Sequence, residues 1–349
     1  MSRRIRFCLG GKAGLPRLGI PTSLRRAGLR VRPRFLAAAT LICFLAGCPT
    51  IGIPKPITPL DFPGPYETEM MIVDLQDAWE YDLNFSVFYP AAEPPPGGFP
   101  VIVFSSGWNQ ARSSYDGMAQ QLAQHGYVVL LRHFPSFGFW DIGWDLFELH
   151  LEQVQLILDW CADQNADPQS VLWRMCDLER LGMTGHSMGG HVGIVRAMAD
   201  PRVKAVVCLD SQVERSTFDT VGDVSALHAP ILHLGAGMGG TCTYFAFSVE
   251  PAVFLYDYSN PPKEEVIITG ADHLDFLDYR LDVPPELDET LCTEGTADNE
   301  RVRELASRYM IAWFNYFIKG QLEFEAHFNG EYSDREEAAG IVTIRRELQ

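Results

Sequence analysis

The sequence predicts an α/β fold, with a mostly parallel sheet of about eight strands and helices on both of its faces. Two observations support this prediction. Short apolar segments alternate with amphipathic segments of helical length between about residues 70 and 320, a pattern typical of a parallel sheet that is covered on both sides. Hydrophobic residues make up 47% of the 349 residues, which is enough to fill such a core.

Each expected strand is a short apolar stretch bounded by Gly, Pro or polar residues. The first two lack a helix between them and are therefore expected to be antiparallel; the later ones read as buried parallel strands. The expected strands span residues 70–75, 83–89, 100–105, 127–131, 181–184, 203–209, 231–234 and 266–269, and the expected helices span 114–126, 145–161, 188–198 and 301–319.

Residues 1–47 are predicted to be an export signal. They contain ten basic residues and no acidic one, and they end in an apolar stretch that is too short to span a bilayer as a helix. The ending Leu45-Ala46-Gly47-Cys48 resembles the bacterial lipobox, which implies that Cys48 carries a lipid; an ordinary signal peptide is the alternative. Because the basic region is unusually long, the true start site is left open, with a start near Val31 as the alternative.

The remaining chain divides into a Pro-rich tether (48–66), the α/β domain (67–320) and a charged C-terminal tail (321–349) that either packs partly on the domain or frays. A lipid anchor implies the bacterial cell envelope, and Pro49 in place of Asp after the lipidated Cys favours the outer membrane. Beyond the export signal, 18 basic residues stand against 45 acidic ones. This charge repels nucleic acid, which is therefore not expected as a partner.

Four cysteines are candidates for disulfides, because an exported protein can keep them. Cys161 and Cys176 bracket a Pro-containing loop, and Cys242 and Cys292 both lie in irregular segments. Sequence alone does not determine the pairing. Cys208 lies in an apolar strand and is expected to be a buried free thiol. No cluster of Cys and His has zinc-ligand spacing, so neither a metal nor a cofactor is expected.

The segment Gly185-His186-Ser187-Met188-Gly189 follows an apolar strand and opens a helix. Gly-x-Ser-x-Gly in this context is typical of a nucleophile elbow, with Ser187 as the nucleophile. Both glycines must lack side chains where strand and helix crowd the serine. The N–H of Met188, at the helix start, is expected to face an oxyanion. A Gly-rich turn without chemistry is the alternative.

His273 is predicted to be the base that activates the serine. It follows the last apolar strand, 266–269, through Gly270-Ala271-Asp272, so it lies on a loop at the carboxyl end of the sheet. The other histidines downstream of the serine lie in a helix, before or within a strand, or after the final helix: His191, His228, His233 and His327.

Asp210 is predicted to be the acid of the triad, because it ends an otherwise apolar strand and could orient the base. The next strand, 231–234, is followed by glycines rather than by an acid. An N-cap role for Asp210 is the alternative. Asp272 and Asp275 lie too close to the base in sequence to reach its far nitrogen, and Asp278 is a weaker alternative acid.

A second oxyanion donor is expected from the loop after residues 100–105. There, Gly107 lets the backbone turn the N–H of Trp108 inward. The indole of Trp108 is also expected to form a wall of the acyl pocket, although a place in the core is the alternative.

These motifs resemble one branch of the α/β-hydrolase superfamily, which holds the platelet-activating-factor acetylhydrolases, the chlorophyllases and the cutinase-like polyesterases. Residues 100–108 and 185–190 resemble the branch as a whole, and Leu209-Asp210 together with 270–276 resembles the acetylhydrolases. The resemblance covers roughly residues 70–320. It implies a serine carboxylic-ester hydrolase that forms an acyl-enzyme from short-to-medium acyl esters or lipid-like esters. A non-catalytic envelope binding module, and a peptidase or thioesterase on the same triad, are the alternatives.

Overall fold

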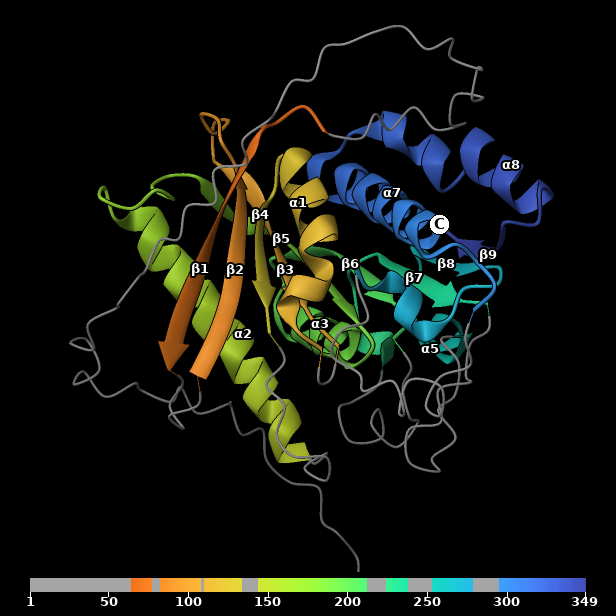
Figure 1. The fold of residues 1–349 in the computed structure, drawn as a ribbon, viewed down its shortest axis with the longest axis horizontal. Helices are drawn as coiled ribbons and strands as arrows, with labels where there is room; N and C mark the ends of the chain where they lie inside the picture. The colour runs from red at the N-terminus through yellow and green to blue at the C-terminus, as the bar shows by residue number, and fades with distance from the viewer. Residues whose placement is uncertain are drawn as a thin grey trace, which may run out of the picture. The chain divides into compact units, whose positions relative to one another are not determined.

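The computed structural model describes residues 64–76, 82–107, 110–133, 144–211, 224–237, 253–278 and 295–349. In this part of the chain, nine strands form one sheet in the order β1-β2-β4-β3-β5-β6-β7-β8-β9 (Figure 1). The strands are β1 (Thr68–Gln76), β2 (Asp82–Pro90), β3 (Phe99–Ser105), β4 (Val128–Arg132), β5 (Cys176–His186), β6 (Val203–Leu209), β7 (Ile231–Ala236), β8 (Lys263–Ile268) and β9 (Val342–Glu347).

The strands β3 to β8 are mutually parallel, and antiparallel pairing occurs only toward the two edges of the described sheet. The α/β prediction is therefore confirmed, with one strand more than expected. The helices are α1 (Asp116–Gln124), α2 (Trp144–Ala166), α3 (Met188–Ala199), α5 (Val253–Tyr258), α7 (Asn299–Lys319) and α8 (Glu331–Ala338), with short 3-10 turns η2 (Arg112–Tyr115), η3 (Val224–Ala226), η4 (His273–Phe276) and η5 (Leu322–His327).

Two apolar cores cover the two faces of the sheet, and β3 shows how one strand supplies both. All seven of its residues are buried. Ile102 and Phe104 point to the core beneath α1 and α7, whereas Val101 and Val103 point to the core beneath α2 and α3. Successive side chains of a strand point to opposite faces, so a continuous apolar run is what a sheet covered on both sides requires. Figure 1 shows α1 and α7 beside each other.

The segment 321–349 is part of the fold. The sequence had left open whether this tail packs on the domain or frays. It forms η5, α8 and β9, and β9 pairs antiparallel with β8. A salt bridge supports this edge, with Arg345 Nε 2.6 Å from Glu265 Oε2. Half of β9 is charged, and five of its six residues are exposed or partly exposed, so this edge strand lacks the apolar signal by which the central strands were found.

The residues predicted to carry the chemistry lie together at the carboxyl ends of the parallel strands. Ser187 directly follows β5, Asp210 directly follows β6, and η4 with His273 lies shortly after β8. The carboxyl ends of parallel strands lie on the same side of the sheet, and functional sites of α/β sheets lie just beyond these ends. No helix in the described ranges is both long and apolar enough to cross a membrane.

Candidate active site

Ser187 occupies a strained turn between β5 and α3. Its backbone has φ 53° and ψ −124°, a conformation that few non-glycine residues adopt and that costs energy. The N–H of Ser187 donates to the carbonyl of Leu209 at 2.9 Å, which anchors the turn to β6. Ser187 itself is partly exposed, so the turn presents its side chain at the edge of the sheet.

Both glycines of the elbow lie where other backbone atoms approach closely; for Gly185 these belong to the helix start, and for Gly189 they belong to the end of β3. A Cβ on Gly185 would lie 2.4 Å from the carbonyl carbon of Gly189. A Cβ on Gly189 would lie 2.2 Å from the carbonyl oxygen of Ser105. Neither neighbour is a flexible side chain, so a methyl group at either position would force the backbone apart.

Asp210 and His273 form a buried hydrogen-bonded pair, with Asp210 Oδ2 2.6 Å from His273 Nδ1. Their side chains are 2% and 7% exposed. The other carboxylate oxygen of Asp210 accepts from the N–H of Ala236 at 2.9 Å. Burial by itself would raise the pKa of Asp210, but the hydrogen bonds from His273 and from Ala236 outweigh it and lower that pKa. Asp210 therefore remains a carboxylate that can orient the imidazole.

The other acids near His273 have different partners. Asp272 accepts from the N–H of Leu274, and Asp275 accepts from the N–H of Asp272, so the two carboxylates form a capping box at the start of η4. Asp278, the alternative acid, accepts from the N–H of Gly117 at 2.7 Å. These carboxylates shape the loop that carries the imidazole, whereas Asp210 is the one that contacts its Nδ1.

Of the two residues expected to donate to an oxyanion, Met188 and Trp108, the structure describes Met188. Met188 begins α3, where the N–H groups of the first turn have no partners within the helix. Trp108 lies outside the described residues. Its neighbour Gly107 is held at both polar groups: the N–H donates to Tyr115 Oη at 3.1 Å, and the carbonyl accepts from Gln110 at 3.1 Å.

His186 has a role that the motif did not reveal. It is buried, its Nδ1 lies 2.8 Å from Tyr115 Oη, and its Nε2 lies 2.9 Å from the carbonyl oxygen of His273. Burial, together with the nearby His273, lowers the pKa of His186 to about 3. Nothing in the sequence singles out Tyr115, an aromatic residue near a helix start, as the partner of His186.

Cys161 and Cys176 lie next to each other, with their sulfur atoms 3.5 Å apart. Both are buried free thiols, so the disulfide between them stays a prediction. Cys208 is a buried free thiol, as expected. The other cysteines singled out by the sequence, Cys48, Cys242 and Cys292, lie outside the described residues. Where side chains are described, no three His, Cys, Asp or Glu residues gather in a way that could hold a metal ion.

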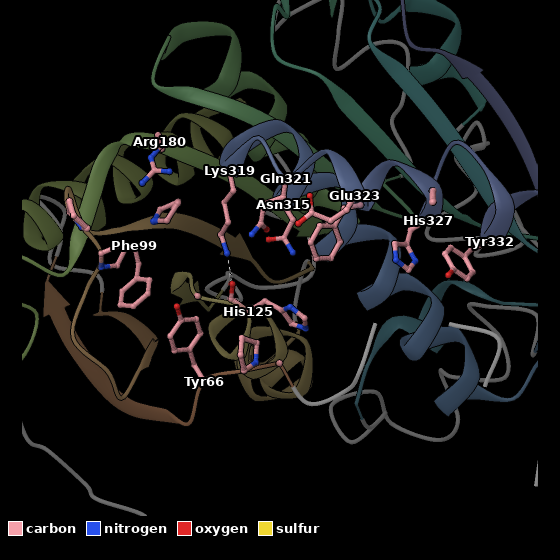
Figure 2. Close-up of a pocket in the computed structure, with 18 of the residues that line it drawn as sticks. Tyr66, Phe99, His125, Arg180, Asn315, Lys319, Gln321, Glu323, His327 and Tyr332 are labelled. Carbon is pink, nitrogen blue, oxygen red and sulfur yellow. Dashed lines mark hydrogen bonds between the residues drawn. The ribbon is translucent and has the colours of Figure 1, made fainter. Parts of the chain in front are cut away.

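A separate pocket of about 1060 Å³ lies at the amino-terminal ends of the parallel strands (Figure 2). Phe99, which begins β3, and Gly126, which precedes β4, both line it. Lys319 of α7 points into it and donates to the carbonyl of His125. Burial lowers the pKa of Lys319 to about 7. Because Ser187 and His273 lie beyond the other ends of the parallel strands, this pocket is not part of their site.

A serine on a strained strand-to-helix turn, with a buried His–Asp pair at the same edge of a mostly parallel sheet, defines an α/β-hydrolase. Residues 64–278 match the family model described as PETase: PET hydrolase-like, which is more than half of the chain. The chain belongs to this PET hydrolase-like family.

Curated relatives agree with this class. Chlorophyllase type 0 of Chenopodium album is 25% identical over 251 residues, which cover 64% of this chain and 69% of that protein. Chlorophyllase-1, chloroplastic, of Citrus unshiu is 22% identical and the match covers 67% and 76%. Platelet-activating factor acetylhydrolase of Cavia porcellus is 20% identical and the match covers 72% of this chain and 65% of that relative's length. With the family, these relatives make the chain an enzyme of the carboxylic ester hydrolase class.

Proposed function

We propose that the chain is a serine esterase in which Ser187, His273 and Asp210 form the catalytic triad. The observation that carries this proposal is the 2.6 Å contact between Asp210 Oδ2 and His273 Nδ1 beside the strained turn of Ser187. Asp210 is a carboxylate and can only accept, so the Nδ1 of His273 carries the proton. The Nε2 of His273 is then the free acceptor that a base requires.

In the first step, Ser187 Oγ attacks the ester carbonyl while its proton passes to His273 Nε2. The negative charge on the carbonyl oxygen is stabilised by the N–H groups of Met188 and Trp108. The imidazolium lies against the Asp210 carboxylate, which favours its formation. When the carbon–oxygen bond to the leaving group breaks, His273 returns the proton to that oxygen, and the alcohol departs.

In the second step, water repeats the sequence on the acyl-enzyme. His273 Nε2 takes a proton from the water, the resulting hydroxide attacks the acyl carbon, and the bond to Ser187 breaks. The proton returns to Ser187 Oγ, and the carboxylic acid leaves. Apart from the ester and the water, the groups used are side chains and backbone amides of this protein.

For substrates, we propose short-to-medium acyl esters or lipid-like esters. The relatives are named for different molecules, namely chlorophyll, platelet-activating factor and PET. An ester bond is the chemistry that these relatives share, so acyl-chain length and leaving group are the variables to measure.

The test is hydrolysis of p-nitrophenyl acetate, butyrate and octanoate by the purified chain and by Ser187→Ala. We expect wild-type turnover and a loss on the order of 10⁴-fold or more in the variant. A fluorophosphonate should label the wild type at Ser187 and leave the variant unlabelled. Thioesters and amides in the same panel identify a thioesterase or peptidase, and a folded wild type that neither turns over any ester nor labels would point to a binding module.

We also propose that Cys48 carries a lipid that anchors the enzyme in the bacterial cell envelope. The sequence Leu45-Ala46-Gly47-Cys48, at the end of a basic and then apolar segment, supports this proposal. Growth with a clickable fatty acid should label the wild-type protein, and Cys48→Ser should remove the label and release the protein from the membrane fraction. Equal labelling of the two proteins would refute the anchor.

A further inference from the structure

Two loops of the site are joined by hydrogen bonds through side chains that the proposed mechanism does not use. The N–H of Gly107 donates to Tyr115 Oη at 3.1 Å, and Tyr115 Oη lies 2.8 Å from His186 Nδ1. On its other side, His186 Nε2 lies 2.9 Å from the carbonyl oxygen of His273. This series of hydrogen bonds therefore connects the loop of Gly107 to the loop that carries His273.

The position of each proton in this series of hydrogen bonds follows from which atoms can donate and which can only accept. The carbonyl of His273 can only accept, so His186 Nε2 carries a proton. His186 is neutral at ordinary pH, because burial and the neighbouring His273 lower its pKa to about 3. Its Nδ1 therefore has a free lone pair, which accepts from the hydroxyl of Tyr115. The oxygen of Tyr115 in turn accepts from the N–H of Gly107.

The residues that make these hydrogen bonds are tightly packed. Tyr115 and His186 are both buried. A Cβ on Gly107 would lie 2.8 Å from His186 Nδ1 and 3.2 Å from Tyr115 Oη, so a side chain there would press on the hydrogen bond between them. The ring of His186 also packs against the ring of His273, with centroids 4.4 Å apart.

We infer that Tyr115 and His186 are positioning residues, which hold the loop of Gly107 and the loop of His273 at fixed places on either side of Ser187. The inference rests on the proposed function, because it assigns an oxyanion donor to the first loop and the base to the second. These loops follow β3 and β8, which are not neighbours in the sheet. Without a tie between them, each could shift independently, and a misplacement of about 1 Å can cost on the order of 100-fold in rate.

The neutrality of His186 is part of this role. During the proposed reaction His273 becomes an imidazolium, and a second cation with its ring centre 4.4 Å away would oppose that change. A neutral His186 that donates from Nε2 holds the backbone of His273 without adding charge.

The decisive variant is Tyr115→Phe, which removes only the hydroxyl, and the chain offers a matched control. Tyr127 is also fully buried, and its hydroxyl donates to Asn315 Oδ1 at 2.8 Å. Tyr127 precedes β4 and lies at the opposite edge of the sheet. Tyr127→Phe therefore removes an equivalent buried hydrogen bond away from Ser187, and should cost similar stability without touching the loops of the site.

For Tyr115→Phe we expect kcat with p-nitrophenyl butyrate to fall by about 10- to 100-fold, with KM within about threefold of wild type. The ratio of variant to wild-type kcat should be the same at every pH on the plateau, because Tyr115→Phe changes how the loops are held and leaves His273 in the protein. Tyr127→Phe should keep the wild-type kcat. A kcat of Tyr115→Phe within about threefold of wild type, or an equal fall in both variants, would overturn the inference.

A second measurement does not depend on turnover. In ¹⁵N-histidine NMR of the wild-type protein, His186 should be protonated at Nε2 and remain neutral at pH 5. Tyr115→Phe should shift the signal of the proton between His273 Nδ1 and Asp210, and Tyr127→Phe should leave it in place. If the chain hydrolyses no ester, this result still decides whether the two side chains hold His273: an unchanged signal in Tyr115→Phe, or a His186 protonated at Nδ1, refutes the role.

Discussion

Asp210 Oδ2 and His273 Nδ1 lie 2.6 Å apart, although 63 residues separate them in the chain. Both residues follow strands of the same parallel run, and both are buried. Asp210 also has a positive φ of 39°, as Ser187 has φ 53°. Of the three non-glycine residues with positive φ in the described part of the chain, two are therefore proposed members of the triad. Backbone strain is concentrated where the fold must aim a side chain.

Asp210→Asn should lower kcat by about 10³- to 10⁴-fold with little loss of structure, because an amide can donate to Nδ1 and stabilise the wrong tautomer of His273. The control is Asp278→Asn, since Asp278 was the alternative acid and its carboxylate binds the N–H of Gly117. Steady-state hydrolysis of p-nitrophenyl butyrate measures both variants. If Asp278→Asn has the larger effect, Asp210 is not the acid.

Gly189→Ala should destabilise the elbow by more than about 3 kcal/mol or prevent folding, because the new Cβ would lie 2.2 Å from the carbonyl oxygen of Ser105. Gly193 lies in the same helix, and a Cβ there would meet Met183 at 3.3 Å. Gly193→Ala should stay within about 1 kcal/mol of wild type and remain active. Urea unfolding and esterase assays compare the two, and equal stability of both variants would contradict the steric account.

Oxidation should join Cys161 and Cys176, whose buried thiols lie 3.5 Å apart. A bridge across these 15 positions should stabilise the protein by about 3 kcal/mol, because it restricts the unfolded chain. Oxidised glutathione followed by mass spectrometry of peptides detects the bridge, and urea unfolding with and without reductant measures its effect. Cys208→Ala should still form the bridge, and Cys161→Ala should not. Peptides that keep both thiols reduced after oxidation would contradict the pairing.

His233 should make folding sensitive to acid. Its ring is buried in β7, neither nitrogen has a hydrogen-bond partner among the described residues, and burial with the nearby charges lowers its pKa to about 3. The unfolded chain binds the proton near pH 6.5 and the folded chain does not, so stability is complete above pH 6.5 and is lost as the pH falls toward 3.

At pH 5 the loss from this residue should be about 2 kcal/mol relative to pH 7. His233→Leu should remove that part of the pH dependence, so that the variant loses less stability than the wild type between the two pH values. Asp116 acts in the opposite direction, since burial raises its pKa to about 6, but it is the same in both proteins. Identical pH dependence of urea unfolding in wild type and variant would show that His233 does not contribute.

The elbow could be read from five consecutive residues because its pattern is short. Gly185 is needed because strand and helix approach each other within that segment, whereas Gly189 is needed because the end of β3, at Ser105, approaches it. Asp210 was harder to find, since many acids follow Ser187 in sequence. The order of the strands, together with the absence of an acid after the next strand, led to it. Its contact with His273 follows from the shared edge of a parallel sheet.

The edge strand β9 and the buried hydroxyl of Tyr115 could not be predicted from the sequence, and each case has a physical reason. β9 is half charged, so its pairing with β8 depends on the sheet it joins rather than on its own apolar pattern. Tyr115 lies near a helix start, and nothing in the adjacent residues indicates that its hydroxyl meets His186.

The sequence by itself determined the α/β class, the nucleophile turn and the residues proposed as base and acid, because each depends on a local pattern or on the order of elements along the chain. Only the tertiary structure decided that His186 is a neutral link between Tyr115 and the carbonyl of His273. That link depends on three groups brought together from β5, η2 and η4. A hydrogen bond acts over about 3 Å, and no spacing in the sequence specifies a distance of that size between residues so far apart in the chain.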